Sequence, residues 1–391
     1  MKKKMFFVLI FSFLMQIGLV NLHAIPAFAR KYRMSCKTCH TPFPKLKEYG
    51  DEFASNGFAI KDKDAPRYTV DTGDDFLSLL RELPIALRLE GFLTYNNADQ
   101  RQVDFTSPYL LKFISGGEIT RNIAYYFYFF FSERGEVAGI EDAFLMFNNL
   151  FRTELDFYVG QFQVSDPLFK RELRLTFEDY MIYKASPGSS LADLTYDRGL
   201  MFTYSLPTNT NAVLEVVNGS GLNPANPFRN FDEDKYKNFL FRVSQDVIDQ
   251  LRIGGFAYLG KEKQDSAINS LWMMGFDATM SSSNLEFNFQ YVERSDKNPN
   301  FLMSAPEDKI KTRGAFAELI YLPKGDDSRW YGVGLWNWVD SDQESMKYGS
   351  ATLHVGVMLR RNIRLTTELG YIYKSIFDKH MRTTVGFVTA F

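Results

Sequence analysis

The residues best suited to chemistry in this sequence form one short stretch, Cys36-Lys37-Thr38-Cys39-His40. This C-x-x-C-H spacing is that of covalent haem c attachment, in which the two thiols add to the vinyl groups of the haem. The imidazole that follows the second thiol then becomes an axial ligand of the iron. The motif therefore predicts one covalent haem c, attached through Cys36 and Cys39, with His40 as the proximal ligand.

Three other uses of the two cysteines fit the sequence less well. A disulfide between Cys36 and Cys39, the only cysteines present, would close a loop too short to constrain the chain. A zinc site needs further Cys or His ligands nearby, and the next histidine after His40 is His354. A thioredoxin-like redox pair would lie in a βαβ context, which the surrounding sequence does not show. Haem attachment is the preferred interpretation.

The N-terminus predicts that the chain is exported. Three lysines at positions 2–4 precede an apolar stretch, residues 5–20, that is too short for a comfortable membrane span. We expect a signal peptide over residues 1–24, with cleavage after Ala24 or after Ala29. Export agrees with the motif, because bacterial haem c is attached outside the cytoplasm.

The composition argues against a nucleic-acid-binding protein and favours strands with one apolar face. Removal of the three signal lysines from 45 basic residues leaves 42 against 47 acidic residues, a net charge near −5. Aromatic residues make up 16% of the chain, with 37 Phe and 21 Tyr. No segment after the signal approaches the length of an apolar transmembrane helix. Such a composition is typical of alternating strands that face an apolar environment on one side.

From Pro84 to Phe391 the sequence repeats a stretch of alternating residues followed by turn residues. In residues 285–291, for example, large apolar side chains alternate with Glu286, Asn288 and Gln290. Period two with a polar alternate face indicates a strand with one face in contact with water. We count about sixteen such runs, which lies within the range of bacterial outer-membrane β-barrels.

The lengths of the connections support a membrane barrel independently. Every second connection is short: around Arg121, Asn148-Asn149, Pro207 to Thr210, Ile248-Asp249, Ser281 to Ser283, Lys324 to Asp327 and Arg361. The others are longer on average, including Val164 to Leu194, Asn218 to Tyr236 and Ser295 to Lys309. Short periplasmic turns that alternate with longer outer loops are a feature of outer-membrane barrels.

A soluble β-barrel or stacked-sheet protein with an aromatic core is the alternative, because alternation alone does not distinguish inside from outside. A closed barrel of this size, however, has a lumen too wide for side chains to fill. The expected inward faces also carry many charges: Glu90, Asp142, Glu154, Asp156, Glu215, Asp277, Glu318, Glu368, Arg88, Lys112, Arg242, Arg252 and Arg382. We therefore predict an all-β protein, with an outer-membrane β-barrel of about 16 antiparallel strands over residues 84–391.

The region before the barrel, residues 25–83, is predicted to be a short helical haem c segment. Residues 44–56 predict one helix, with Leu46, Tyr49 and Phe53 on one face and Gly57 as its stop signal. A segment this short cannot enclose a haem within a core of its own. We expect the haem to take part of its surroundings from the barrel lumen.

The sequence on both sides of the motif carries a more specific signal. Ile25-Pro26-Ala27-Phe28-Ala29-Arg30 precedes it, and Pro44-x-Leu46-x-x-Tyr49-Gly50-x-x-Phe53-x-x-x-Gly57-Phe58 follows it. Together with the C-x-x-C-H motif, these residues resemble the N-terminus of fused monohaem cytochrome–porin proteins, a family that includes outer-membrane iron(II) oxidases. The resemblance extends to Phe58, and over the barrel it rests on architecture.

The resemblance implies a role in electron transfer across the outer membrane. The family moves electrons between an extracellular donor or acceptor and a periplasmic c-type cytochrome, with the barrel surrounded by outer-membrane lipid. With ferrous iron as the donor, the chain would be an iron(II):cytochrome oxidoreductase. Two alternatives stay open: a diffusion porin whose haem segment is a plug or a redox sensor, and a soluble haem-binding β protein.

A second, distal ligand of the iron is harder to find in the sequence. His354 is the candidate, because Leu353, Val355 and Val357 would face lipid and turn His354 into the lumen together with Met358. The alternative is that His354 is an ordinary polar residue of the lumen.

Overall fold

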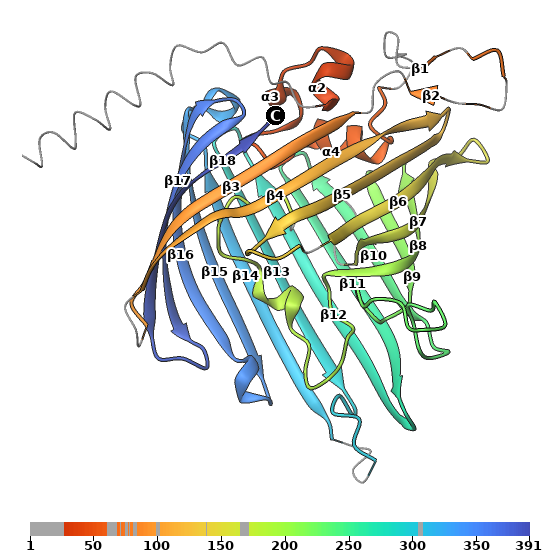
Figure 1. Ribbon diagram of the computed structural model, residues 1–391, viewed down its shortest axis with the longest axis vertical. Coiled ribbons are helices and arrows are strands. Elements are labelled where there is room, and N and C mark those ends of the chain that lie inside the picture. The colour runs from red at the N-terminus through yellow and green to blue at the C-terminus, as the bar shows by residue number, and fades with distance from the viewer. Residues whose placement is uncertain are drawn as a thin grey trace, which may run out of the picture.

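The computed structural model describes residues 27–60, 69–70, 72–74, 77, 79–80, 84–98, 102–137, 139–164, 172–303 and 308–391. The predicted signal peptide, residues 1–24, lies outside these ranges. The second predicted cleavage site, after Ala29, falls within helix α2 (Ala27–Tyr32). The two main regions are an N-terminal segment, residues 27–60, and a barrel, residues 84–391 (Figure 1).

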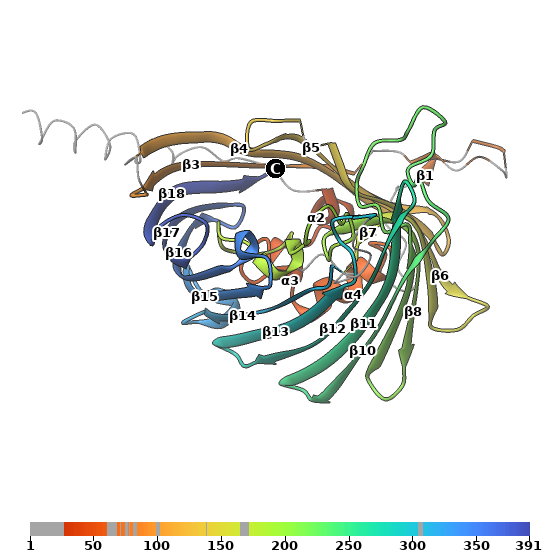
Figure 2. The ribbon, with the colours of Figure 1, turned by 90° about the horizontal axis from the view of Figure 1, so that it is seen from below.

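Sixteen antiparallel strands form a closed barrel, as the sequence predicted (Figures 1 and 2). Each strand pairs with the next along the chain, and the last strand pairs with the first. The strands are β3 (Ile85–Asn96), β4 (Gln102–Thr120), β5 (Ile123–Glu133), β6 (Gly139–Leu150), β7 (Leu155–Gln163), β8 (Tyr196–Leu206), β9 (Thr210–Val217), β10 (Asn238–Ile248), β11 (Leu251–Gln264), β12 (Ala267–Ser281), β13 (Leu285–Asp296), β14 (Ile310–Tyr321), β15 (Trp330–Ser341), β16 (Tyr348–Arg360), β17 (Ile363–Lys374) and β18 (His380–Ala390). A separate pair, β1 (Thr69–Val70) and β2 (Leu79–Leu80), precedes the barrel. Closure pairs every strand on both sides, which is what a sheet that crosses a membrane requires.

The connections alternate in length as predicted. Those at one end are short, and we call this the periplasmic end; the C-terminus also lies there (Figure 1). The turn after β6 comprises residues 151–154 and not the predicted Asn148-Asn149, because both asparagines continue the strand. The outer connections include the long stretches between β7 and β8 and between β9 and β10, although β11 and β12 are joined by residues 265–266 alone.

The two faces of the strands separate as the alternation predicted. On β16, Leu353, Val355 and Val357 are exposed on the outside, whereas Thr352 and His354 are buried inside. An exposed apolar outer face is what contact with lipid requires. No helix in the part of the chain that the structure describes is long and apolar enough to cross a membrane.

The lumen differs from the predicted polar interior, because large apolar side chains also point inward. On β5, Tyr126, Tyr128 and Phe130 are buried and alternate with the outward face. Residues 172–195, in the connection between β7 and β8, fold into the barrel, where the short helix η1 (Met181–Lys184) packs against β14 and β15 (Figure 2). Two further short helices, η2 (Gly325–Asp327) and η3 (Glu344–Met346), lie in connections.

The N-terminal segment contains α2, α3 (Cys36–Cys39) and α4 (Glu48–Ser55). The predicted helix over residues 44–56 forms only in its second part, because the chain first doubles back on the motif: His40 pairs with Leu46, and Thr41 N donates to Lys45 O. Gly57 ends α4 as predicted, with φ +69°. The hydrogen bond from Phe58 N to Phe53 O closes the turn in the manner of a Schellman motif.

Candidate functional site

The C-x-x-C-H motif forms one turn of helix, which brings its two thiols onto the same face. Cys36 and Cys39 are one turn apart in α3, and His40 N donates to Cys36 O at 2.9 Å. Both thiols are free and half-buried, and burial raises the pKa of each. A reactive dithiol instead has a thiol whose pKa is lowered. These surroundings are unlike those of a thioredoxin-like redox pair.

The His40 imidazole is held in the form that binds iron. Its Nδ1 donates to Pro44 O at 2.8 Å, and because a carbonyl can only accept, the lone pair of the neutral ring lies on Nε2. Burial lowers the pKa of His40 to about 4, so the ring is neutral at physiological pH. The Phe43 ring packs edge-on against the imidazole, with ring centroids 5.1 Å apart. The donor set of two thiols and one neutral imidazole fits a covalent haem c.

Polar contacts hold the motif against the turn between β14 and β15. Asp326 accepts hydrogen bonds from Lys47 Nζ at 2.8 Å and from Thr41 Oγ1 at 2.9 Å. Lys37 Nζ reaches Asp327 Oδ1 at 3.2 Å. The charged pairs are partly exposed, so each contributes at most about 1 kcal/mol. Their main effect is to orient the motif at the periplasmic opening of the barrel.

An apolar contact at the end of α4 holds the segment more firmly. Phe58 is 5% exposed and stacks on Phe28 from α2 and on Tyr126 from β5, with ring centroids 4.4 Å and 5.2 Å apart. Gly57 allows this approach, because an added Cβ would lie 2.5 Å from Ala124 Cβ. Phe58 therefore packs against the inner face of β5 near the periplasmic end of the barrel.

A pocket lies beside the motif and is lined from both regions of the molecule. The segment contributes Cys36, His40 and Phe43, and the barrel contributes Leu322 and Met358 among others. This lining agrees with the expectation that the barrel supplies part of the surroundings of the motif. The meeting point is the periplasmic opening of the barrel, not the middle of its lumen.

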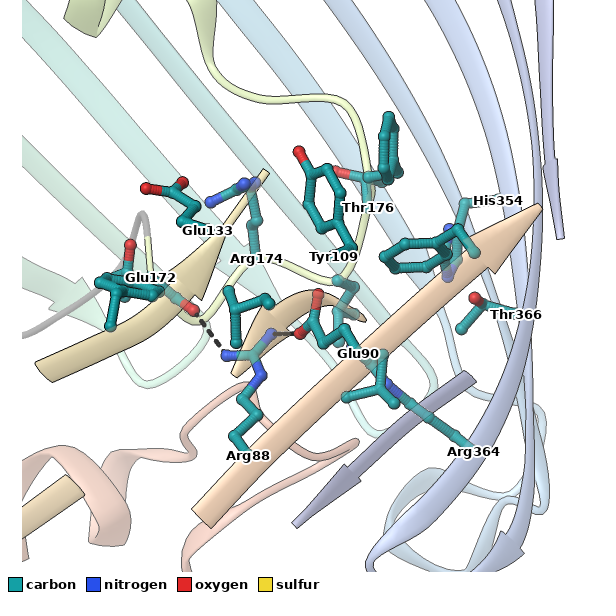
Figure 3. A pocket seen from close by; sticks show the side chains of 16 residues that line it. Arg88, Glu90, Tyr109, Glu133, Glu172, Arg174, Thr176, His354, Arg364 and Thr366 are labelled. Atoms are coloured by element: carbon teal, nitrogen blue, oxygen red, sulfur yellow. Dashed lines mark hydrogen bonds and ion pairs between the residues drawn. The ribbon is translucent and has the colours of Figure 1, made fainter. Parts of the chain in front are cut away.

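His354 lies in a different pocket, inside the barrel (Figure 3). Its inward orientation is confirmed, since the side chain is buried. Its Nδ1 lies 3.0 Å from Glu368 Oε2, and its Nε2 lies 3.4 Å from the Tyr331 hydroxyl. Neither Cys36 nor His40 lines this second pocket. The structure does not bring His354 together with the motif, and the geometry lends no support to its predicted role as a ligand.

Several of the charges near His354 are paired. Arg88 forms an ion pair with Glu90 and donates to Glu172 O at 3.1 Å (Figure 3). Lys112 Nζ lies 2.8 Å from Glu172 Oε2. Among the described residues, no group of three or more His, Cys, Asp or Glu side chains could hold a metal ion. A haem iron draws most of its ligands from the porphyrin, so this finding concerns only a separate protein-bound ion.

Reasoning from the sequence missed the barrel residues that meet the motif. Asp326 and Asp327 were visible as part of a short turn, and Lys37 and Lys47 flank the motif. No pattern in the sequence connects these positions, because they lie nearly three hundred residues apart. Only one local feature of the sequence indicated the stack of Phe58 on Tyr126. That feature is the Gly57-Phe58 pair, which follows a short helix.

Comparisons with known proteins identify the barrel fold. No protein-family model and no curated protein matches the chain. The anion-selective porin from Comamonas acidovorans is similar, with 11% identity and a TM-score of 0.58 over 79% of this chain and 99% of that chain. OmpF of Salmonella typhi, in complex with daunomycin, is similar with 9% identity and a TM-score of 0.58 over 79% and 97%. The outer membrane channel DcaP of Acinetobacter baumannii has 11% identity and a TM-score of 0.56 over 79% and 97%.

At these identities the likeness concerns the fold. The chain has the closed sixteen-strand architecture of outer-membrane porins. Together with the exposed apolar outer face, this fold agrees with the predicted location in the outer membrane of a Gram-negative cell.

Proposed function

We propose that this chain is a fused monohaem cytochrome–porin that passes single electrons across the outer membrane. Cys36 and Cys39 would attach one haem c, and His40 Nε2 would bind its iron. The bound haem would supply a one-electron carrier. The partners would be a periplasmic c-type cytochrome and an extracellular electron donor or acceptor, and the resemblance of the N-terminus suggests ferrous iron as the donor.

The observation that carries this proposal is the filled interior of the barrel. A diffusion porin with this many strands keeps an aqueous channel, and the side chains that line such a channel stay exposed to water. In this barrel the inward side chains of Tyr128, Met201 and Tyr258 have 0% exposure. Such an interior argues against an open path for solutes, and the C-x-x-C-H motif is the feature that points to a redox site.

The connection between β7 and β8 supplies much of this filling, and buried charges hold it in place. Glu262 on β11 accepts hydrogen bonds from Leu191 N at 2.7 Å and Ala192 N at 3.0 Å. Glu368 on β17 accepts hydrogen bonds from Phe177 N and Glu178 N in the same way. We call residues 172–195 the lumen loop. Carboxylates from opposite parts of the barrel fix the lumen loop, which therefore acts as a built-in plug.

Aromatic stacking adds to the plug at η1. Tyr180 stacks on Phe316 of β14 with ring centroids 4.2 Å apart, and its hydroxyl donates to Glu318 Oε1 at 2.9 Å. The Tyr180 side chain is 2% exposed, so displacement of the lumen loop would have to break this stack and this hydrogen bond.

The position of the motif defines how the two partners would approach. The motif lies at the periplasmic end, where a soluble cytochrome can reach it directly. The apolar band of an outer-membrane barrel is about 25 Å tall, so electrons from an outer partner would have to cross the filled lumen to reach the motif. This asymmetry predicts fast electron transfer with the periplasmic cytochrome and slower electron transfer with the outer partner.

The second candidate function is a diffusion porin in which the haem segment is a plug or a redox sensor. The comparisons favour this candidate, because the similar structures are porins and a channel, including one described as anion-selective. Under this function, a change at the motif would alter the passage of solutes.

One set of measurements on the purified full-length protein tests both candidates. We expect a covalent c-type spectrum that ferrous iron reduces under anaerobic conditions, together with little or no conductance in planar bilayers. Discrete open channels and a haem that only dithionite reduces would instead support the porin. Absence of covalent haem from protein made in a host that matures c-type cytochromes would reject electron transfer through this motif.

A further inference from the structure

We infer that Met358 would supply the second protein ligand of the haem iron, with His40 as the first. This inference rests on the proposed haem attachment and adds a residue that the motif itself does not contain. A sequence-based search favoured His354, four positions earlier on the same strand. The structure separates these two inward residues into different pockets.

Met358 lines the pocket that also contains the motif. The pocket beside Cys36 and His40 includes Met358, whereas the pocket around His354 includes none of these three residues. Met358 points inward by the alternation of β16 and is half-buried. It lies near the end of β16, at the periplasmic opening, where the motif also lies.

The backbone of Met358 is hydrogen-bonded to the turn between β14 and β15, which also holds the motif. Met358 N donates to Arg329 O at 2.8 Å, which ties the end of β16 to the turn after β14. Asp326 in that turn binds Lys47 and Thr41 of the segment. The same turn of the barrel therefore contacts both the N-terminal segment and Met358, and a ligand needs such defined placement.

The chemistry of the pocket leaves Met358 as its suitable sixth donor. Methionine sulfur paired with histidine is an established ligand set of c-type cytochromes and raises the reduction potential of the iron. The carboxylate of Asp326 is engaged by Lys47 and Thr41. Arg361 and Lys37 are cations and carry no lone pair for iron at neutral pH.

Two rival donors are held elsewhere. His354 has Glu368 and Tyr331 at its two ring nitrogens. Met34, close to the motif in sequence, packs against the apolar cluster that includes Phe53 and Phe58. Neither residue lines the pocket beside the motif.

The test compares the ferric spectra of the full-length protein and three variants. The wild type should show a low-spin haem with the weak red absorption band that arises from charge transfer between methionine sulfur and ferric iron. M358L should lose this band, shift towards high spin, lower the midpoint potential and bind carbon monoxide rapidly when reduced. M34L is the matched control, because it removes another thioether close to the motif in sequence. This variant should keep the wild-type spectrum.

A fourth measurement separates ligation from packing. M358H should restore a six-coordinate low-spin haem without the sulfur band and at a lower potential than the wild type, which a purely structural role for Met358 would not produce. The inference is overturned if M358L keeps the sulfur band, if M34L loses it, or if the wild type never shows it. Each of these outcomes leaves the covalent haem in place and is therefore distinct from the failure of the proposed function, in which no haem is attached.

Discussion

The N-terminal segment and the barrel are stabilised in different ways. Every barrel strand has a partner on both sides, so its backbone hydrogen bonds need nothing from the segment. The longest helix of the segment, α4, has 8 residues, and an isolated helix of that length is marginal in water. Phe58 in the lumen and Asp326 at the opening give the segment its order.

This difference shows that the residues of the C-x-x-C-H motif lie in the region that depends on the other for its order. The barrel is the scaffold, and the segment is folded against it. Changes in the segment should therefore spare the barrel, whereas changes at the barrel opening should loosen the segment. The experiments below test this one-way dependence, beginning with the largest expected effect.

Replacement of both thiols, C36S with C39S, should abolish covalent haem completely and leave the barrel folded. The thiols belong to the segment, and no strand pairing depends on them. Haem staining after denaturing electrophoresis measures the first effect, and the mobility difference between heated and unheated protein measures the second. A barrel that fails to fold in this variant would contradict the one-way dependence.

Deletion of residues 176–192 from the lumen loop should convert a closed barrel into a conducting one. The deletion removes η1 and the backbone groups that Glu262 and Glu368 bind. Single-channel recordings in planar bilayers measure the change. Deletion of residues 222–234, from the outer connection between β9 and β10, is the matched control. This deletion should leave the barrel non-conducting.

F58A should release the segment from the barrel without unfolding the barrel. Loss of a buried phenylalanine typically costs about 3–5 kcal/mol, and this side chain links both regions through Phe28 and Tyr126. Limited proteolysis should cut the segment much faster and leave the barrel band intact. F228A is the control, because Phe228 is 84% exposed in an outer connection. Equal protease resistance in F58A and the wild type would contradict the assigned contact.

D326A should have the smallest effect, at most about 1 kcal/mol on the attachment of the segment. Burial acts to raise the pKa of Asp326, but hydrogen bonds from Lys47 and Thr41 outweigh it and lower the pKa below its usual value of 3.8. A lowered pKa in the folded protein means that the stabilisation is present above pH 3.8 and is lost as the pH falls through the folded value.

Proteolytic release of the segment measured against pH tests this contact. The wild type should release the segment more readily as the medium is acidified below pH 3.8, whereas D326A should show a flatter profile. D340A is the control, because Asp340 pairs with Lys374 towards the outer end of the barrel. A D340A profile as flat as that of D326A would show that the contact at Asp326 is not the cause.

Several features of the structure differ from what the local sequence pattern indicated, and contacts outside that pattern explain the differences. The helix over residues 44–56 begins only at Glu48, because His40 pairs with Leu46. The lumen is not polar throughout, although the apolar residues at alternate positions of β5 were a visible sign. His354 faces inward as predicted, but its partners are Glu368 and Tyr331.

The sequence by itself determined the presence of the C-x-x-C-H motif and of the barrel. Both are local: the motif depends on the spacing of three neighbouring residues, and strands are indicated by period-two alternation and short turns. Only the tertiary structure decided which barrel residues meet the motif and how the lumen is filled. Contacts such as Lys47 with Asp326 and Phe58 with Tyr126 depend on strand register and on closure of the barrel, which bring together residues with no shared local pattern.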